Sequence, residues 1–234
     1  MIPLRDDAPR SSTPYVTYFL IALNTLVFLF ELMLAPAGRQ QFFFQFGVVP
    51  ANLSGLLHGQ PGISVQAALL PIFTSMFLHG SWLHIIANMW ALWIFGDNIE
   101  DYLGPFRYLL FYLVTGIAAN GAQTMFNPDS TVPTIGASGA IAGVMGAYFL
   151  LYPSARVLTL VPFFFVFFTW LPAWVVLGYW FLVQFLSGAA TSISSAGQDS
   201  GGVAFWAHVG GFLAGVALVK LLPKRPQRYR YPDW

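Results

Sequence analysis

The sequence predicts an all-α membrane protein, a bundle of six transmembrane helices, and two observations support this prediction. Hydrophobic residues make up 57% of the 234-residue chain and charged residues only 8%, whereas soluble domains carry about 25% charged residues. Six apolar segments also approach the roughly 20 residues that a helix needs to cross the hydrocarbon core of a bilayer. The connections between them are short enough that we expect one membrane-embedded domain and no separate soluble domain.

The six predicted spans are separated by polar, glycine-containing or proline-containing breaks. They comprise residues 14–34, 81–101, 105–125, 137–152, 170–188 and 203–222. The polar residues 1–13 precede an apolar run that exceeds the roughly 7–15 hydrophobic residues of a signal peptide, so we expect a retained first span. The chain is therefore interpreted as a cytoplasmic N-terminal segment (1–13), a six-span domain (14–222) and a cytoplasmic basic tail (223–234).

The positions of the positive charges predict the orientation, because cytoplasmic loops carry an excess of Lys and Arg. With six spans, nine of the ten Lys and Arg residues share the side of the two termini, and only Arg39 falls on the other side. Both termini are therefore predicted to be cytoplasmic. The compact layout without a mitochondrial presequence favours the plasma membrane of a prokaryote. The lipid bilayer is the expected surrounding, and the net charge of +1 gives no nucleic-acid signature.

Two apolar stretches lie between the predicted spans. The connection after the first span contains Phe42–Phe44 and an apolar run over 67–77, both too hydrophobic for a solvated loop, and we expect them to lie partly in the outer interface. Residues 161–168 form the second stretch. Two alternatives stay open for it: it extends the fifth span, or it bends along the bilayer.

Span 4 is too short to cross the bilayer, because about 16 residues give roughly 24 Å of helix. If Pro153 and Arg156 hold its cytoplasmic end at the interface, then Ser138 begins the helix below the outer surface. A helix start buried at membrane depth requires neighbouring backbone that lines a polar or wet cavity. We therefore expect a recessed fourth helix with Ser138 at a cavity.

Three polar side chains on other spans fall at a similar depth. Span 6 descends from the same side and places His208 roughly 7–8 Å deep. Span 2 places His84 near its start, with Asn88 one helical turn further on the same face. A histidine can remove the proton from a serine hydroxyl at neutral pH. Since span 6 has no Asp or Glu near His208, we predict a catalytic dyad of Ser138 and His208.

Acyl transfer also needs donors for the developing oxyanion, and three candidates are present. They are the Ser138 backbone amide at the helix start and the side chains of His84 and Asn88. Ordinary packing is the alternative for each residue, because serine and asparagine in transmembrane helices often only connect neighbouring helices. For the Gly139/Gly143 and Gly211/Gly215 pairs we adopt that simpler interpretation, and they would bring spans 4 and 6 together.

The remaining histidines are weaker candidates, and we expect neither a metal nor a cofactor. His79 lies near the start of span 2 and His58 in the preceding connection. A metal site built from His79, His84 and His208 is conceivable but lacks a carboxylate or cysteine partner. The chain contains no cysteine, which excludes disulfides and thiolate chemistry.

Taken together, Gly136-Ala137-Ser138-Gly139, His84-Ile85-Ile86-Ala87-Asn88 and Ala207-His208 with Gly211 resemble the motifs of the rhomboid intramembrane serine proteases. Residues 96–104 are similar to the family's GxxxExxxG motif, which implies a structural role for Glu100. The resemblance implies Ser138 as nucleophile and His208 as general base and acid. It also implies that His84, Asn88 and the Ser138 amide stabilise the oxyanion, and that Gly136 keeps the approach to it open.

Two positions depart from the family's pattern. Some members carry a tyrosine one turn after the serine that stacks on the catalytic histidine, and this chain has Ala142 there. We expect another aromatic residue, Trp206 or Tyr148, to support His208, or none. Some members also have a Trp-Arg pair in the first outer loop, and this loop contains no tryptophan.

The resemblance implies an intramembrane serine endopeptidase that cleaves transmembrane segments of other membrane proteins. Substrates would approach sideways and unwind, because a peptide bond in an intact helix is hydrogen-bonded and covered. Span 5 or its outer loop is the expected gate. One alternative is a noncatalytic rhomboid-like protein that binds membrane clients. A small transporter or channel is another, disfavoured because no charged residue lies at mid-membrane.

Overall fold

The computed structural model describes residues 1–162, 166–194 and 203–225. Its elements, in chain order, are β1 (Ile2–Asp6), α1 (Tyr15–Met33), α2 (Pro36–Phe46), α3 (Pro50–Leu57), α4 (Val65–Thr74), the 3-10 turn η1 (Ser75–Phe77), α5 (Trp82–Leu103), α6 (Pro105–Phe126), α7 (Ser138–Leu151), β2 (Arg156–Pro162), β3 (Val166–Pro172), α8 (Ala173–Ser194) and α9 (Phe205–Leu221). The helices α1, α5, α6, α7, α8 and α9 coincide with the six apolar segments to within a few residues at most ends. The basic tail lies outside the described residues from 226 onward.

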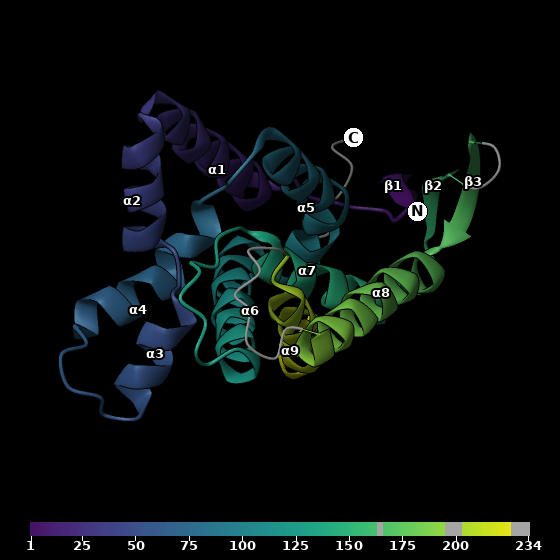
Figure 1. Cartoon of the computed structure of the whole chain (residues 1–234). Helices are drawn as coiled ribbons and strands as arrows, with labels where there is room; N and C mark the ends of the chain where they lie inside the picture. Colours follow the sequence, from purple (N-terminus) through teal and green to yellow (C-terminus); the bar gives the residue numbers. More distant parts are fainter. Residues whose placement is uncertain (163–165, 195–202, 226–234) are drawn as a thin grey trace, which may run out of the picture.

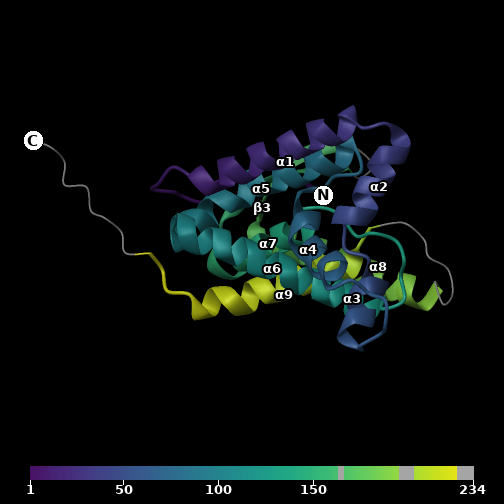
Figure 2. The same ribbon diagram turned by 90° about the vertical axis from the view of Figure 1, so that its left-hand side faces the viewer.

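Helix α7 lies at the centre of the bundle. Its residues Gly139–Tyr148 are all buried, and α5, α6 and α9 pack around it. Figures 1 and 2 show α7 enclosed by these helices, with α1 beyond α5. A helix that is apolar on every face belongs inside a bundle, so the sequence of α7 accounts for its central place.

Glycines bring the backbones of α7 and α9 into direct contact. A Cβ atom on Gly211 would lie 2.0 Å from the carbonyl oxygen of Gly139, and one on Gly215 would lie 1.9 Å from that of Gly143. Small residues at this spacing let two membrane helices approach closely. The packing role inferred for the two glycine pairs is thus confirmed.

The outer helices present apolar side chains outward. On α1, Leu26 is 65% exposed and Met33 is 83% exposed. Among the described residues, α1, α6 and α8 are long and apolar enough to cross a membrane, and the pair α4–η1/α5, bent by 75°, adds one more. Helices α7 and α9 are shorter apolar helices. The chain is a multi-pass membrane protein, because these apolar faces require lipid around them.

The connection between α1 and α5 folds into three short helices, α2, α3 and α4. An isolated bridge between Val48 and Thr134 joins this region to the loop before α7. The amide of Asn120 on α6 donates to the carbonyl oxygen of Ile72 on α4, at 3.0 Å. The region therefore packs against the end of the bundle at which Ser138 lies, as Figure 1 shows for α3 and α4 beside α6.

A three-stranded antiparallel sheet with the order β1-β2-β3 lies at the far end of α7 from Ser138. Ile2 pairs with Leu160, and Arg156 pairs with Pro172. The hydroxyl of Tyr148 on α7 donates to a carboxylate oxygen of Asp6. The first alternative for residues 161–168, an extension of the fifth span, is wrong, because Val161 and Pro162 end β2, residues 166–168 begin β3, and α8 begins only at Ala173. The second alternative, a bend along the bilayer, stays a prediction, and residues 163–165 lie outside the described residues.

Glu100 joins α5 to the start of α1. Its carboxylate accepts hydrogen bonds from the backbone amides of Val16 at 2.9 Å and Thr17 at 2.8 Å, and from the Thr17 hydroxyl at 2.8 Å. The first amides of a helix lack partners within it, and a carboxylate there also favours the helix dipole. Glu100 therefore caps α1, which confirms the structural role expected for it.

Candidate active site

Ser138 is the first residue of α7, and the backbone before it has a conformation that requires glycine. Gly136 has a φ of +128°, which residues with a side chain rarely adopt. A Cβ atom there would also lie 2.7 Å from Nε2 of His84. The Gly136 amide donates to the Ser75 carbonyl at 2.9 Å. This turn presents the Ser138 hydroxyl and the first amides of α7 to one space.

His208 lies in the first turn of α9 and is 8% exposed. Its Nε2 atom is 2.7 Å from Oγ of Ser138. The glycine contacts between α7 and α9 hold the two backbones at the distance that this hydrogen bond needs. The structure therefore brings together the two residues that the sequence pairs, across 70 positions.

His84 and Asn88 lie one turn apart on α5, beside the start of α7. The closeness of the His84 ring to Gly136 places it at the approach to Ser138. Asn88 is buried, and its Nδ2 atom lies 3.0 Å from Nε2 of His79. The His79 ring packs edge-on against His84, with ring centroids 5.0 Å apart. His79, the weaker candidate, thus orders both His84 and Asn88.

A buried carboxylate fixes His79 in turn. The His79 amide donates to the Glu31 carboxylate of α1, at 3.2 and 3.3 Å from its two oxygens. Glu31 is itself fully buried. His58 is not part of this group, because it ends α3 with its Nδ1 atom 2.8 Å from its own helix's Ser54 carbonyl.

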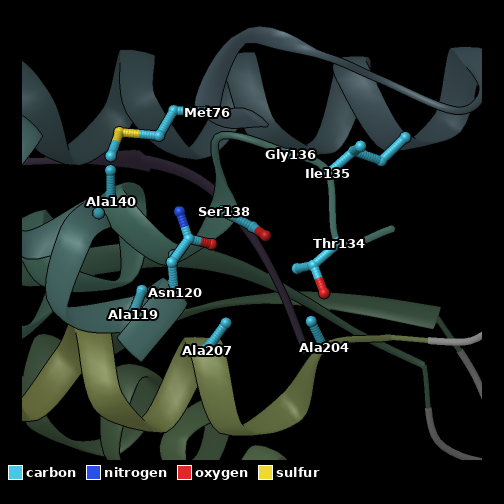
Figure 3. A pocket seen from close by; sticks show the side chains of 12 residues that line it. Met76, Ala119, Asn120, Thr134, Ile135, Gly136, Ser138, Ala140, Ala204 and Ala207 are labelled. Carbon is cyan, nitrogen blue, oxygen red and sulfur yellow. The ribbon is translucent and has the colours of Figure 1, made fainter. Parts of the chain in front are cut away.

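Two hollows meet at Ser138. A small cavity of about 10 Å³ lies behind it, between α6, α7 and α9, with Asn120 as a polar wall. Figure 3 shows the side chains that line this cavity, with Ser138 and Asn120 among them. A larger groove of about 1060 Å³ contacts both Ser138 and His208 and runs between α5 and α8. Its lining is mostly apolar, so an apolar chain segment fits its chemistry.

Two residues of α8 contact His208 and were not predicted. Gln184 Oε1 lies 2.7 Å from Nδ1 of His208, and the Trp180 ring lies 5.6 Å from the His208 ring, tilted by 37°. The signal for Gln184 was present, because a polar side chain inside an apolar span is costly unless it has a partner. No pattern in the sequence tells that this partner is His208.

The two aromatic residues expected to support His208 make contacts with other residues instead. Trp206 stacks on Phe126 with centroids 4.0 Å apart, and its Nε1 donates to Ser192 Oγ at 3.0 Å. Tyr148 binds Asp6 at the other end of α7. The prediction of Trp206 or Tyr148 is therefore wrong, since Trp180 takes that place from a helix that the prediction did not consider.

Fold and site together define a class: multi-pass helical membrane proteins in which a groove between helices reaches a hydrogen-bonded serine and histidine. A family model described as the rhomboid domain matches residues 66–225, more than half of the chain. The chain belongs to the rhomboid family. The match spans the part of the chain from α4 to just beyond α9, and so includes every candidate residue of the site.

Curated relatives come from several kinds of membrane. The chain is 31% identical over 161 residues to the Rhomboid-like protein 11, chloroplastic, of Arabidopsis thaliana, covering 65% of this chain and 52% of that protein. It is 29% identical over 165 residues to the Rhomboid protein 1, mitochondrial, of Saccharomyces cerevisiae, covering 69% and 44%. It is 32% identical over 143 residues to the Rhomboid protease GluP of Bacillus subtilis, covering 61% and 25%. The chain thus spans about half or less of these relatives, and they do not support a prokaryotic origin over an organellar one.

Proposed function

We propose that this protein is an intramembrane serine endopeptidase that cleaves transmembrane segments of other membrane proteins. The observation that carries the proposal is the 2.7 Å contact between Ser138 Oγ and His208 Nε2 at the wall of a groove between helices. Membership in a family that includes a protein named rhomboid protease supports it.

The proposed first step is attack of Ser138 Oγ on a peptide carbonyl carbon. His208 Nε2 takes the hydroxyl proton as the new C–O bond forms, and later gives it to the leaving amine. The oxygen that becomes negative lies near the first amides of α7, His84 and Asn88, which donate hydrogen bonds to it. Such donors contribute most where water is excluded, and two side chains of this site, Asn88 and His208, are buried.

The second step is hydrolysis of the acyl-enzyme, which needs one water beside Ser138. The small cavity behind Ser138 has a volume of about 10 Å³ and a polar wall at Asn120. A buried water needs about this volume and two or more polar partners. The cavity is therefore a suitable place from which water reaches the ester carbon.

The substrate segment would lie in the large groove between α5 and α8. Helix α8 contacts α9 and α7 and the sheet, and its groove side includes Trp180 and Gly188. We propose that α8 moves as the gate for the substrate. A crosslink that pins α8 against α5 is expected to stop cleavage, and unchanged cleavage would count against this gate.

The proposed topology has six spans, with α7 as a recessed fourth span and both termini in the cytoplasm. Helix α7 has 14 residues, which give about 21 Å. Because the chain has no cysteine, single cysteines report the sides of the membrane directly. Arg39→Cys should react with an impermeant maleimide from outside and Arg156→Cys only after lysis. The opposite pattern would reverse the orientation. Fractionation of the source cells would identify the host membrane.

The deciding experiment incubates the purified full chain with a labelled single-span substrate and, separately, with a fluorophosphonate probe. Ser138→Ala and His208→Ala should abolish both cleavage and labelling, because each removes one partner of the pair. Thr25→Ala on α1 and His58→Ala on α3 serve as matched controls and should behave like the parent. Cleavage by either site variant would refute the dyad. A parent protein that binds the segment without cleavage or labelling would be a noncatalytic client-binding protein.

A further inference from the structure

Helix α8 supplies two supports for His208 from positions four residues apart. Trp180 places its ring against the imidazole, and Gln184 places its amide oxygen 2.7 Å from Nδ1. Residues at this spacing share one face of a helix. One face of α8 therefore meets the part of His208 that points away from Ser138.

The hydrogen-bond partners of His208 determine which ring nitrogen carries the proton. An amide oxygen only accepts, so Gln184 Oε1 requires a proton on Nδ1. Nε2 of the neutral ring is then bare and accepts the Ser138 hydroxyl proton, which is the form that a general base needs. If the Gln184 amide were turned to donate to Nδ1, the proton would lie on Nε2 and the base would be blocked.

We infer that Gln184 is a positioning residue that fixes the tautomer and ring plane of His208, so that the site is competent only while α8 is seated against α9. This inference rests on the proposed function and deepens it. Helix α8 also forms one wall of the groove. The wall that a substrate segment contacts is thus the element that prepares the base.

The first experiment separates the accepting oxygen from the bulk of the side chain. Gln184→Glu keeps an acceptor at the same length, and Gln184→Met keeps the length without an amide oxygen. Val183→Met, at a lipid-facing position of the same helix, is the matched control. The readouts are the rate of Ser138 labelling by a fluorophosphonate, kcat and KM for the labelled substrate, and the melting temperature.

We expect Gln184→Met to lower the labelling rate and kcat about 10- to 100-fold, a part of the roughly 10²–10⁴-fold that a positioned base contributes. KM and the melting temperature should stay near the parent's values, since neither substrate contacts nor core packing are removed. Gln184→Glu should label far faster than Gln184→Met, and Val183→Met should match the parent.

Two results would overturn the inference. One is a Gln184→Met protein that labels as fast as the parent. The other is a folded Gln184→Glu protein that is as slow as Gln184→Met, because the amide would then act as a donor. Both differ from failure of the proposed function, in which the parent itself is not labelled and Ser138→Ala changes nothing.

The second experiment tests the seating of α8 without altering Gln184. A Cβ atom on Gly188 would lie 3.3 Å from Cβ of Phe205, close to the separation of about 3.5–4.5 Å in disulfides. In the Gly188→Cys/Phe205→Cys protein, oxidation should leave the rate of Ser138 labelling equal to that of the reduced form, because α8 is pinned where Gln184 meets His208. A labelling rate that falls on oxidation and returns on reduction would overturn the inference.

Discussion

The interface of α9 with α7 and the interface of α9 with α8 hold the same histidine in different ways. Between α7 and α9 the backbones touch at Gly211 and Gly215, so no side chain separates the two helices at these points. Between α8 and α9 the contacts are made by side chains, among them Gln184 and Trp180, and much of α8 is exposed. The comparison teaches that the nucleophile and base are fixed by backbone contact, whereas the base is oriented by a helix that has room to move.

The largest expected effect comes from breaking the backbone contact. Gly215→Ala would place a methyl group 1.9 Å from the Gly143 carbonyl oxygen, so α7 and α9 must separate. Overpacking of this kind costs about 1–3 kcal/mol or more, and we expect a lower melting temperature together with loss of Ser138 labelling. Gly178→Ala on α8 is the matched control, because its nearest neighbour, a Phe149 ring carbon, would be 3.7 Å away. Equal tolerance of both changes would show that the backbone contact between α7 and α9 does not limit stability or labelling.

The next effect concerns the approach to the oxyanion space, with the interface intact. Gly136→Ala meets the His84 ring and must adopt a φ of +128°, which costs about 1–3 kcal/mol of strain. We expect a strong loss of labelling in a protein that still folds, measured by fluorophosphonate labelling and circular dichroism. Gly121→Ala, with open space around it, should change neither. Normal labelling of Gly136→Ala would show that the turn tolerates a side chain.

A smaller effect is expected from one shared donor. Asn88→Ala removes an oxyanion donor and also releases His79, to which Asn88 is hydrogen-bonded. A main donor contributes roughly 2.7–4 kcal/mol to kcat, and donors that share the charge contribute less. We therefore expect a partial loss of kcat with KM unchanged. Asn52→Ala on α3 is the control and should have the parent's kcat. Complete inactivity of a folded Asn88→Ala protein would identify Asn88 as the main donor and contradict the shared arrangement.

The smallest effect lies at the other end of α7, where Asp6 meets Tyr148. Burial raises the pKa of the Asp6 carboxyl above its ordinary value. A carboxyl with a raised pKa in the folded state contributes stability at low pH and loses it as the pH rises through that value. The parent's melting temperature should therefore fall slightly from about pH 4 to about pH 8 relative to that of Asp6→Asn. The same pH profile in both proteins would show that Asp6 contributes nothing to this dependence.

Much of the helix layout could be predicted, because long apolar runs and their breaks are local signals. The bounds of α1, α7 and α9 follow from Pro14, the glycine-rich turn at Gly136, and Pro223 with the basic residues that follow it. The pairing of Ser138 with His208 also followed, since both lie near the starts of their helices and so near one depth. Contacts without a repeating pattern could not be predicted. Gln184 and Trp180 lie on an apolar helix, and the spacing of its residues does not determine which face of the helix is turned toward His208.

The sheet could not be predicted from the sequence, for a different reason. An apolar run such as 156–162 reads equally as a strand or as part of a span, and what decides between them is a partner strand. That partner, β1, lies more than 150 residues earlier, in the short polar segment before the first span. The arrangement of the sheet depends on pairing between residues far apart in the sequence, which no short stretch of sequence indicates.

The pairing of β1 with β2 also has a consequence for the time course of synthesis. Ile2 is made before its partner Leu160, which follows roughly 10–30 s later at typical translation rates of about 5–20 residues per second. The first strand must therefore wait with its hydrogen-bonding groups in water or on a chaperone while several helices insert. Closure of the sheet then reports that the central helix has arrived, because Tyr148 at its end binds Asp6. Energy transfer between two fluorophores placed on β1 and β2 would measure when the sheet forms during assembly in the membrane.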